Sequence, residues 1–181
     1  ENARFARLDV TDAQSWSAVV AAAEEAFGPI TALVNNAGVG YPVSFDDLTE
    51  EAYRRIIDVN QIGVFLGMKA VVPSMRKRTS GGASIVNISS TAGLRAGANT
   101  MAYVASKFAV TGMSKSGALD LGPEGIRVNS VHPGAIAGTG LEQVRSVIDA
   151  GADGAAVISA IFRAPDPADA CRSFRRLVDD A

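Results

Sequence analysis

Three side chains that suit acid–base chemistry lie close together in the sequence. Tyr103 and Lys107 are four residues apart in Tyr-Val-Ala-Ser-Lys, and Ser90 precedes Tyr103 by thirteen residues. Positions four apart share one face of a helix, so the phenol and the ammonium can face one site. A nearby cation favours the phenolate, and the Ser90 hydroxyl can donate and accept hydrogen bonds. The trio suits the interconversion of an alcohol and a carbonyl.

The Tyr-x-x-x-Lys spacing has an alternative interpretation. The same spacing occurs in amphipathic helices whose lysine lies along apolar surface with its ammonium in water. The choice between a site and a solvated helix face therefore depends on the elements that would position the three side chains.

The composition is that of a globular protein with its own core. The chain has 181 residues, of which 48% are hydrophobic and 20% charged. A net charge of −2 gives no electrostatic reason to expect nucleic acid or an anionic membrane as partner. No run of eighteen apolar residues predicts a membrane span. A single cysteine, Cys171, excludes an internal disulfide and suits a reducing compartment such as the cytoplasm.

We expect no metal site. The only histidine, His132, has no evident acidic partner, and we interpret it as part of a turn and not as a base or a ligand.

Strands and helices alternate along the chain. Thr11 is the expected N-cap of the first helix, with Gln14 completing a capping box. We expect strands ending at residues 8–10 and covering 30–34, 83–88 and 126–131, and helices over 11–27, 49–78 and 101–121. This alternation predicts parallel βαβ units in a doubly wound α/β sheet.

Polar or glycine-containing segments follow the predicted strands. Asp9, the Asn-Asn-Ala-Gly turn at 35–38, Ser90 and Pro133-Gly134 all lie at carboxyl ends of strands. Ligands of such sheets bind in the crevice beyond those ends. This coincidence favours a site over a solvated helix face.

Six segments resemble the short-chain dehydrogenase/reductase family in their order and spacing, over residues 8 to about 136. They are Leu-Asp-Val-Thr at 8–11, Asn-Asn-Ala-Gly at 35–38, Val-Asn-Gln-Ile-Gly at 59–63, Asn-Ile-Ser-Ser at 87–90, Tyr-Val-Ala-Ser-Lys at 103–107 and Arg-Val-Asn-Ser-Val-His-Pro-Gly at 127–134. The resemblance implies a Rossmann-like sheet.

The resemblance implies four catalytic residues. Tyr103 would be the general acid/base, and Lys107 would favour its phenolate and bind the nicotinamide ribose. Ser90 would hold the substrate oxygen. Asn60 would anchor a water in a proton relay through Lys107, although a buried structural asparagine is the alternative.

The resemblance also implies NAD or NADP as cofactor. Asp9 and Val10 would meet the adenine. Asn36, Ala37 and Gly38 would line the adenosine side, and the residues that would border the nicotinamide are Pro133, Gly134 and Ile136. Asn35 is interpreted as a structural residue that bonds backbone across strands, and Ser89 as a structural neighbour of Ser90.

Compared with the family pattern, the chain lacks the phosphate-binding glycine loop. We therefore interpret residues 1–181 as a single partial domain without the first βαβ unit and the last strand, with 137–164 as the substrate-loop region. The segment that separates NAD from NADP is absent, so both cofactors stay open.

The resemblance implies oxidation of a secondary alcohol or reduction of a ketone. The segments at 63–69 and 87–94 look like those of hydroxysteroid dehydrogenases, and 3-oxoacyl or sugar substrates remain open. Helices 49–78 and 101–121 would form a homodimer or homotetramer. The alternative is a truncated, inactive chain that only associates with other subunits.

Overall fold

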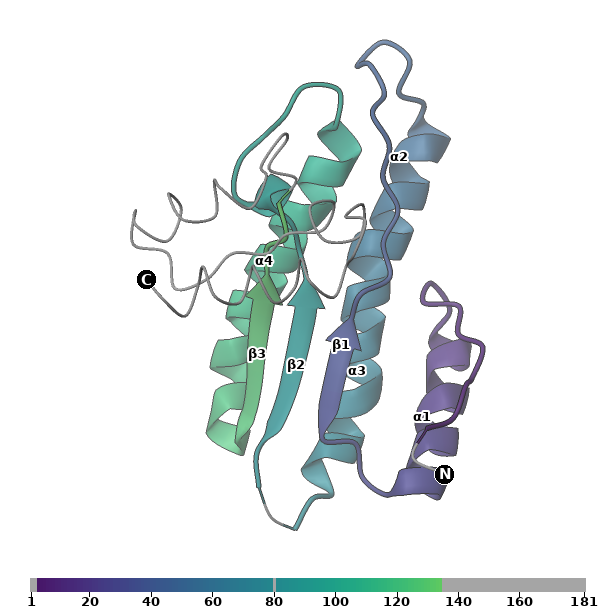
Figure 1. Ribbon diagram of the computed structural model, residues 1–181, viewed down its shortest axis with the longest axis vertical. Coiled ribbons are helices and arrows are strands. Elements are labelled where there is room, and N and C mark those ends of the chain that lie inside the picture. Colours follow the sequence, from purple (N-terminus) through teal and green to yellow (C-terminus); the bar gives the residue numbers. More distant parts are fainter. Residues whose placement is uncertain (1–2, 80, 135–181) are drawn as a thin grey trace, which may run out of the picture. The chain divides into compact units, whose positions relative to one another are not determined.

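The computed structural model describes residues 3–79 and 81–134 (Figure 1). The chain divides into two compact units, Glu1–His132 and Pro133–Ala181. All described residues except Pro133 and Gly134 belong to the first unit, so the predicted substrate-loop region, Ile136 and Cys171 lie outside the described residues.

The described strands form a three-stranded parallel sheet. They are β1 (Ala32–Asn35), β2 (Ala83–Ile88) and β3 (Ile126–Val131), in the order β1-β2-β3. The register pairs Ala32 with Ser84, and Ala83 with Ile126. The carboxyl ends of all three strands therefore lie at one edge, where the loops that follow them can meet.

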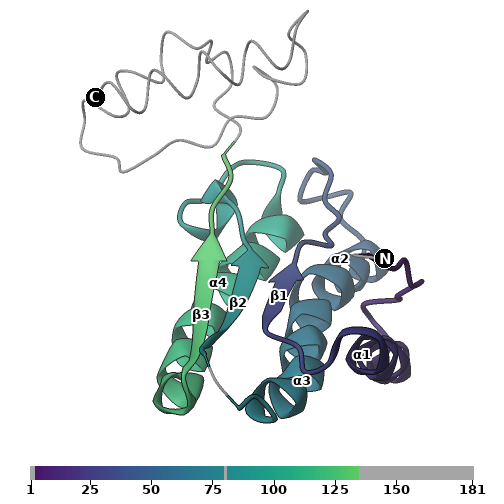
Figure 2. The same cartoon turned by 60° about the horizontal axis from the view of Figure 1, so that its bottom comes forward.

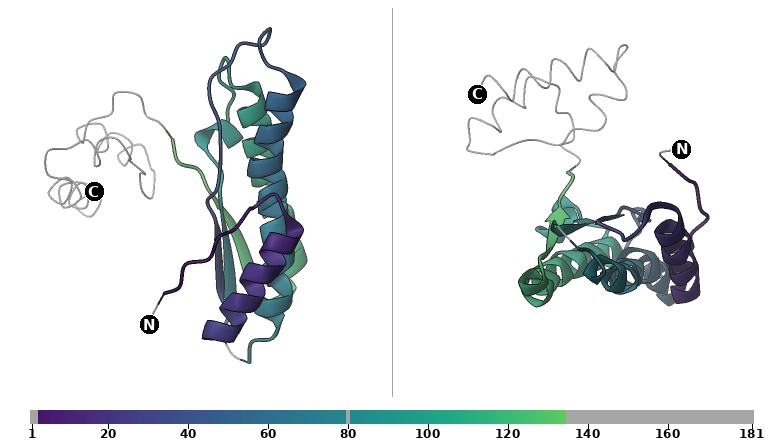
Figure 3. Two further views of the ribbon diagram at one scale, coloured as in Figure 1. Left: turned by 90° about the vertical axis from the view of Figure 1, so that its right-hand side faces the viewer. Right: turned by 90° about the horizontal axis from the view of Figure 1, so that it is seen from below.

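Helices pack on one face of this sheet. In order they are α1 (Ala13–Phe27), α2 (Glu50–Ile57), α3 (Gly63–Arg76) and α4 (Met101–Leu121). In two views α3 and α4 lie side by side beneath the strands, and α1 packs against α3 (Figure 2, Figure 3).

The core lies between the sheet and these helices. Alternate strand residues such as Ile85 and Val128 are buried against Val71 and Met75 of α3. No described helix covers the opposite face of the sheet (Figure 3). On that face Val34 is 60% exposed. The second helix layer of a doubly wound sheet is thus not among the described residues.

Most predicted elements are confirmed. The strands at 83–88 and 126–131 and the helix at 101–121 have the predicted bounds, whereas the strand predicted at 30–34 is shifted to Ala32–Asn35. The strand predicted to end at residues 8–10 is absent, because a strand needs a hydrogen-bonded neighbour and no described strand lies beside this segment.

The predicted cap at Thr11 is also wrong. Asp12 is the N-cap of α1, and its Oδ1 accepts a hydrogen bond from Gln14 N at 2.8 Å. The Thr11 hydroxyl donates instead to Asp9 Oδ1 at 2.7 Å, so it is not available to the helix. A carboxylate suits the helix N-terminus because it also complements the helix dipole.

The helix predicted over 49–78 spans Glu50–Arg76 and contains a π-helical segment, η1 (Asp58–Ile62), between α2 and α3. By length and composition this helix could cross a membrane, in contrast to the expectation from the sequence. Core helices of soluble proteins have the same properties, and Val64, Val71 and Met75 are buried in the first unit.

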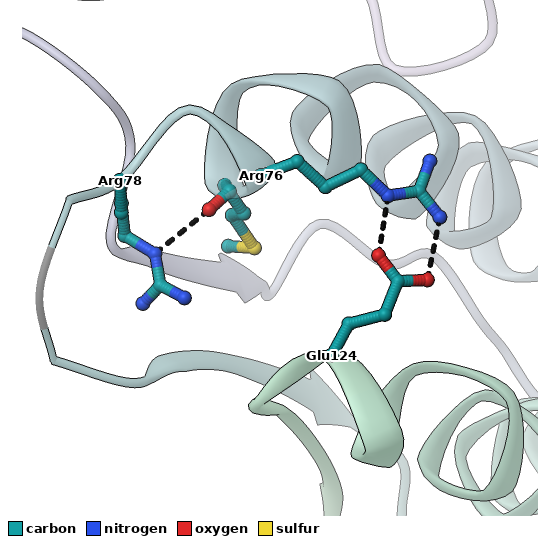
Figure 4. Close-up of polar contacts among 4 residues, drawn as sticks. Arg76, Arg78 and Glu124 are labelled. Atoms are coloured by element: carbon teal, nitrogen blue, oxygen red, sulfur yellow. Dashed lines mark hydrogen bonds and ion pairs between the residues drawn. The ribbon is translucent and has the colours of Figure 1, made fainter.

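Two arginines near the end of this helix fix its C-terminus (Figure 4). Arg76 Nη2 lies 2.7 Å from Glu124 Oε1, which joins α3 to the turn before β3, and the bond from Arg76 lowers the pKa of Glu124. Arg78 Nε donates to Met75 O at 2.7 Å. Both side chains are largely exposed to solvent, so this ion pair adds little to stability.

Candidate active site

The Lys107 side chain is buried beneath the carboxyl edge of the sheet. It is 4% exposed, and its Nζ donates a hydrogen bond to Ile88 O, at the end of β2, at 2.7 Å. Nζ also lies 5.6 Å from the centroid of the Tyr103 ring. Burial lowers the pKa of Lys107 because the charged form loses hydration. The structure therefore brings the ammonium and the phenol ring to one face of α4.

The turn of α4 that carries Lys107 is fixed to the loop after β2. Thr111 Oγ1 donates to Lys107 O at 2.9 Å, and Ser89 Oγ lies 3.0 Å from the same carbonyl oxygen. A Cβ at Gly93 would lie 2.7 Å from Lys107 O, so only glycine fits there. Ser89 is 3% exposed and supports the site structurally.

Asn60 connects three segments from within the π-helical η1. Its Oδ1 accepts from Val39 N at 2.7 Å, and its Nδ2 donates to Val39 O at 2.8 Å and to Ser106 Oγ at 3.1 Å. Ser106 Oγ in turn donates to Tyr103 O at 2.7 Å. Asn60 is fully buried, so its side chain holds the loop after β1 against the Tyr103 turn of α4.

Two glycines in that loop approach the candidate catalytic side chains. A Cβ at Gly38 would lie 3.4 Å from Asn60 Oδ1 and 3.7 Å from Lys107 Nζ. A Cβ at Gly40 would overlap the ring of Tyr103. The loop backbone thus lies directly beside the ammonium and the phenol.

Ser90 begins the short 3₁₀ helix η2 (Thr91–Gly93). It is 9% exposed, and its Oγ accepts a hydrogen bond from Ala92 N at 3.0 Å. The hydroxyl hydrogen is therefore available to donate to another group. His132 Nδ1 lies 3.0 Å from Ser90 O, a contact that the sequence pattern did not reveal because it joins the ends of two strands.

A cavity of about 210 Å³ lies at the end of β1. Its lining includes Val10, Asn36 and Ala37, three of the residues predicted to meet the adenosine. Asp9 does not line this cavity. It lies in a separate open depression with Glu50 and Arg54, and hydrogen bonds from Thr11 lower the pKa of Asp9.

The predicted nicotinamide border is only partly described. Pro133 and Gly134 are half-buried and have no regular secondary structure, and Ile136 lies outside the described residues. Within the first unit, the fit to a dinucleotide depends on the cavity beside Val10, on the glycine backbone at 38 and on the Lys107 ammonium, which suits hydroxyl groups as a hydrogen-bond donor.

Comparison with known proteins identifies the family. The model of the short chain dehydrogenase family matches residues 1–147. The chain belongs to the short-chain dehydrogenase family. This confirms the resemblance seen in the sequence and the Rossmann-like α/β fold, and members of this family named below are dehydrogenases.

Three relatives illustrate the range of named activities. The chain is 52% identical over 134 residues to trans-4-hydroxycyclohexanecarboxylate dehydrogenase of Sinomonas cyclohexanicum, covering 74% of this chain and 51% of the relative. It is 49% identical, with the same coverage, to 3-alpha-(or 20-beta)-hydroxysteroid dehydrogenase of Mycobacterium bovis. Cyclopentanol dehydrogenase of Comamonas sp. is 39% identical over 180 residues, covering 98% of this chain and 70% of the relative.

A solved structure, ElxO with NADP bound, matches with a TM-score of 0.68 and 32% identity. The match covers 72% of this chain and 52% of that one. The chain spans about half the length of the first two relatives and of this structure.

Proposed function

We propose that the protein containing this chain is an NAD(P)-dependent oxidoreductase that interconverts a secondary alcohol and a ketone. The observation that carries the proposal is the buried Lys107 ammonium, 5.6 Å from the Tyr103 ring centroid and close to the Gly38 backbone. A buried cation beside a phenol is costly for a purely structural helix face, because burial disfavours the charge. The same arrangement keeps a hydrogen-bond donor next to a tyrosine that could act as an acid or base.

Each side chain has a separate task in this proposal. Tyr103 gives or takes a proton at the substrate oxygen, while Ser90 donates its free hydroxyl hydrogen to the same oxygen. Lys107 holds its ammonium beside the Tyr103 ring and has N–H groups for the ribose. The bound nicotinamide supplies or accepts the hydride.

The hydrogen bonds of Asn60 refine its proposed role in a proton relay. Both amide hydrogens are used, by Val39 O and Ser106 Oγ. Asn60 can therefore only accept a hydrogen bond from a relay water, through its main-chain or side-chain oxygen. The same water can accept a hydrogen bond from the Lys107 ammonium, because an ammonium only donates. The water would thus connect Lys107 to Asn60 in the proposed proton relay.

The relatives favour ring-bearing substrates. The three named above are called dehydrogenases of a hydroxycyclohexanecarboxylate, a hydroxysteroid and cyclopentanol. We therefore propose a hydroxysteroid or another alicyclic secondary alcohol ahead of a 3-oxoacyl chain. Either NAD or NADP is compatible with the described residues.

We further propose a homodimer or homotetramer in the cytoplasm. A groove of about 350 Å³ between α3 and α4 is lined by apolar side chains that include Phe65 and Met68, and by the charged side chains of Lys69, Arg76 and Asp120. Phe65 is 47% exposed, and a second copy of this face would bury it. The cytoplasmic location is consistent with the single cysteine.

The test is turnover of alicyclic alcohols by the complete protein and by its Tyr103→Phe variant, followed by NAD(P)H absorbance. The variant keeps the ring that packs against Gly40 but removes the acidic proton. We expect a loss of at least about a hundredfold in kcat, the low end for acid–base catalysis. Near-normal turnover would remove Tyr103 from its role, and no turnover by the wild-type protein would favour the inactive, associating chain.

A further inference from the structure

Ser90 lies just beyond the point where backbone hydrogen bonds hold its strand. Among the described residues, the last backbone hydrogen bond between β2 and β3 runs from Ser89 N to Val131 O at 2.8 Å. Val131 is paired with Ile88, so the next backbone donor of this parallel ladder would be residue 133. That residue is proline, which has no N–H. The ladder therefore cannot continue through the backbone.

The His132 ring instead joins the ends of the two strands through a side chain. Nδ1 lies 3.0 Å from Ser90 O, and because a carbonyl oxygen only accepts, Nδ1 must carry a hydrogen. Nε2 lies 2.9 Å from Ser130 Oγ, which can donate to it when the ring is neutral. Ser130 and His132 are two residues apart on an extended segment, so both side chains project to the same side. The two contacts together fix the ring and its tautomer.

From this geometry we infer that His132 is a positioning residue for Ser90. Its Nδ1–H holds the Ser90 carbonyl, and with the bond from Ala92 N to Ser90 Oγ it fixes where the hydroxyl points. The inference rests on the proposed function, in which Ser90 holds the substrate oxygen. A displacement of about 1 Å in such a group can lower turnover about a hundredfold.

Kinetics of the complete protein test this role with four variants: His132→Ala, His132→Asn, Ser90→Ala and the double variant Ser90→Ala/His132→Ala. His132→Ala removes the donor, and we expect kcat to fall about ten- to hundredfold with the Kd for NAD(P)H unchanged. Asparagine places an N–H near the position of Nδ1, so His132→Asn should recover most of the loss. In the Ser90→Ala background, His132→Ala should change kcat little further, because the hydroxyl that His132 positions is no longer present.

Other results would overturn the inference. An equal loss in both backgrounds would mean that His132 acts independently of Ser90. A parallel loss of cofactor affinity, or a His132→Asn variant as slow as His132→Ala, would mean that the residue only stabilises the turn.

Nuclear magnetic resonance tests the same contact without any activity. With ¹⁵N-labelled histidine in the complete protein, the His132→Asn variant identifies the His132 signals. At a pH where the ring is neutral, we expect its hydrogen on Nδ1. A ring with hydrogen only on Nε2 would overturn the inference even in a fully active enzyme. An inactive protein with the Nδ1–H ring would instead reject the proposed function and leave the His132–Ser90 contact established.

Discussion

At the scale of single residues, Lys107 has the least favourable environment in the site. Its ammonium is buried, and Ile88 O is its hydrogen-bond acceptor in the first unit. Burial disfavours the charged form, so the pKa of Lys107 is below its usual value of 10.5. Such a cost is expected at a functional site, where a charge is kept for chemistry and not for stability.

The pH dependence of folding measures this cost. Because the pKa of Lys107 is lower in the folded state, the unfolded chain binds more protons between that value and 10.5. Raising the pH through this window therefore stabilises the wild-type fold. Methionine in Lys107→Met has a similar length but does not titrate. As the pH rises through this window, we expect the free energy of unfolding of the wild type to increase relative to that of the variant, by about 1.4 kcal/mol for each unit by which the pKa is lowered.

Urea unfolding of both proteins at neutral pH and near pH 10 would provide the comparison, since all other titrating groups are shared. A difference that stays constant, or that shifts in favour of the variant at high pH, would show that Lys107 is not held in a desolvated position.

At the scale of elements, close approaches at glycine decide how the helices pack. A Cβ at Gly67 of α3 would lie 2.5 Å from Asn35 Oδ1 and 2.8 Å from Trp16 Cζ2. Trp16 is itself held by a hydrogen bond from its Nε1 to Val10 O at 3.0 Å. One glycine thus allows α1, β1 and α3 to meet.

Gly67→Ala should destabilise the fold, because the added methyl meets a buried amide and an indole that cannot both move. We expect a loss of about 1–3 kcal/mol in the free energy of unfolding. Gly112→Ala is the matched control, since that glycine also lies inside a helix but nothing lies within 4 Å of its Cβ position. There alanine should gain up to about 1 kcal/mol from helix propensity. Equal effects in chemical denaturation would contradict the packing argument.

At the scale of the whole molecule, the described unit has two surfaces on which large apolar side chains are exposed. One is the face of the sheet opposite α3 and α4, where Val34 and Val131 are exposed. The other is the groove between those helices, where Phe65 is exposed. The chain spans about half the length of the first two relatives named above. The groove is the surface that we assign to subunit association.

Phe65→Asp tests that assignment in the complete protein. The change replaces an aromatic ring that a second copy would bury with a second carboxylate in a groove that already contains Asp120, so we expect the assembly to dissociate to monomers. Leu119→Asp is the control, because Leu119 is 81% exposed on α4 and does not line the groove. The measurement is molar mass by light scattering. An unchanged mass for Phe65→Asp, or equal dissociation by both variants, would place the interface elsewhere.

The sequence by itself determined the family, the alternation of elements and the bounds of β2, β3 and α4. These features depend on local patterns: apolar runs, glycine and proline stops, and short motifs around Ser90 and Tyr103. Local patterns failed where an element depends on a neighbour. Residues 8–10 are of strand-forming types, but no strand among the described residues lies beside them, and the Thr11 hydroxyl donates to Asp9 instead of capping the helix.

Only the tertiary structure decided how the site is held. The bonds of Asn60 to Val39 and Ser106, and of His132 to Ser90, join residues that are between 21 and 46 positions apart. Such contacts have no periodicity or motif, since they arise from the meeting of strand ends and loops at one edge of the sheet. For that reason the sequence could name Ser90, Tyr103 and Lys107, whereas the role of His132 became visible only in the folded chain.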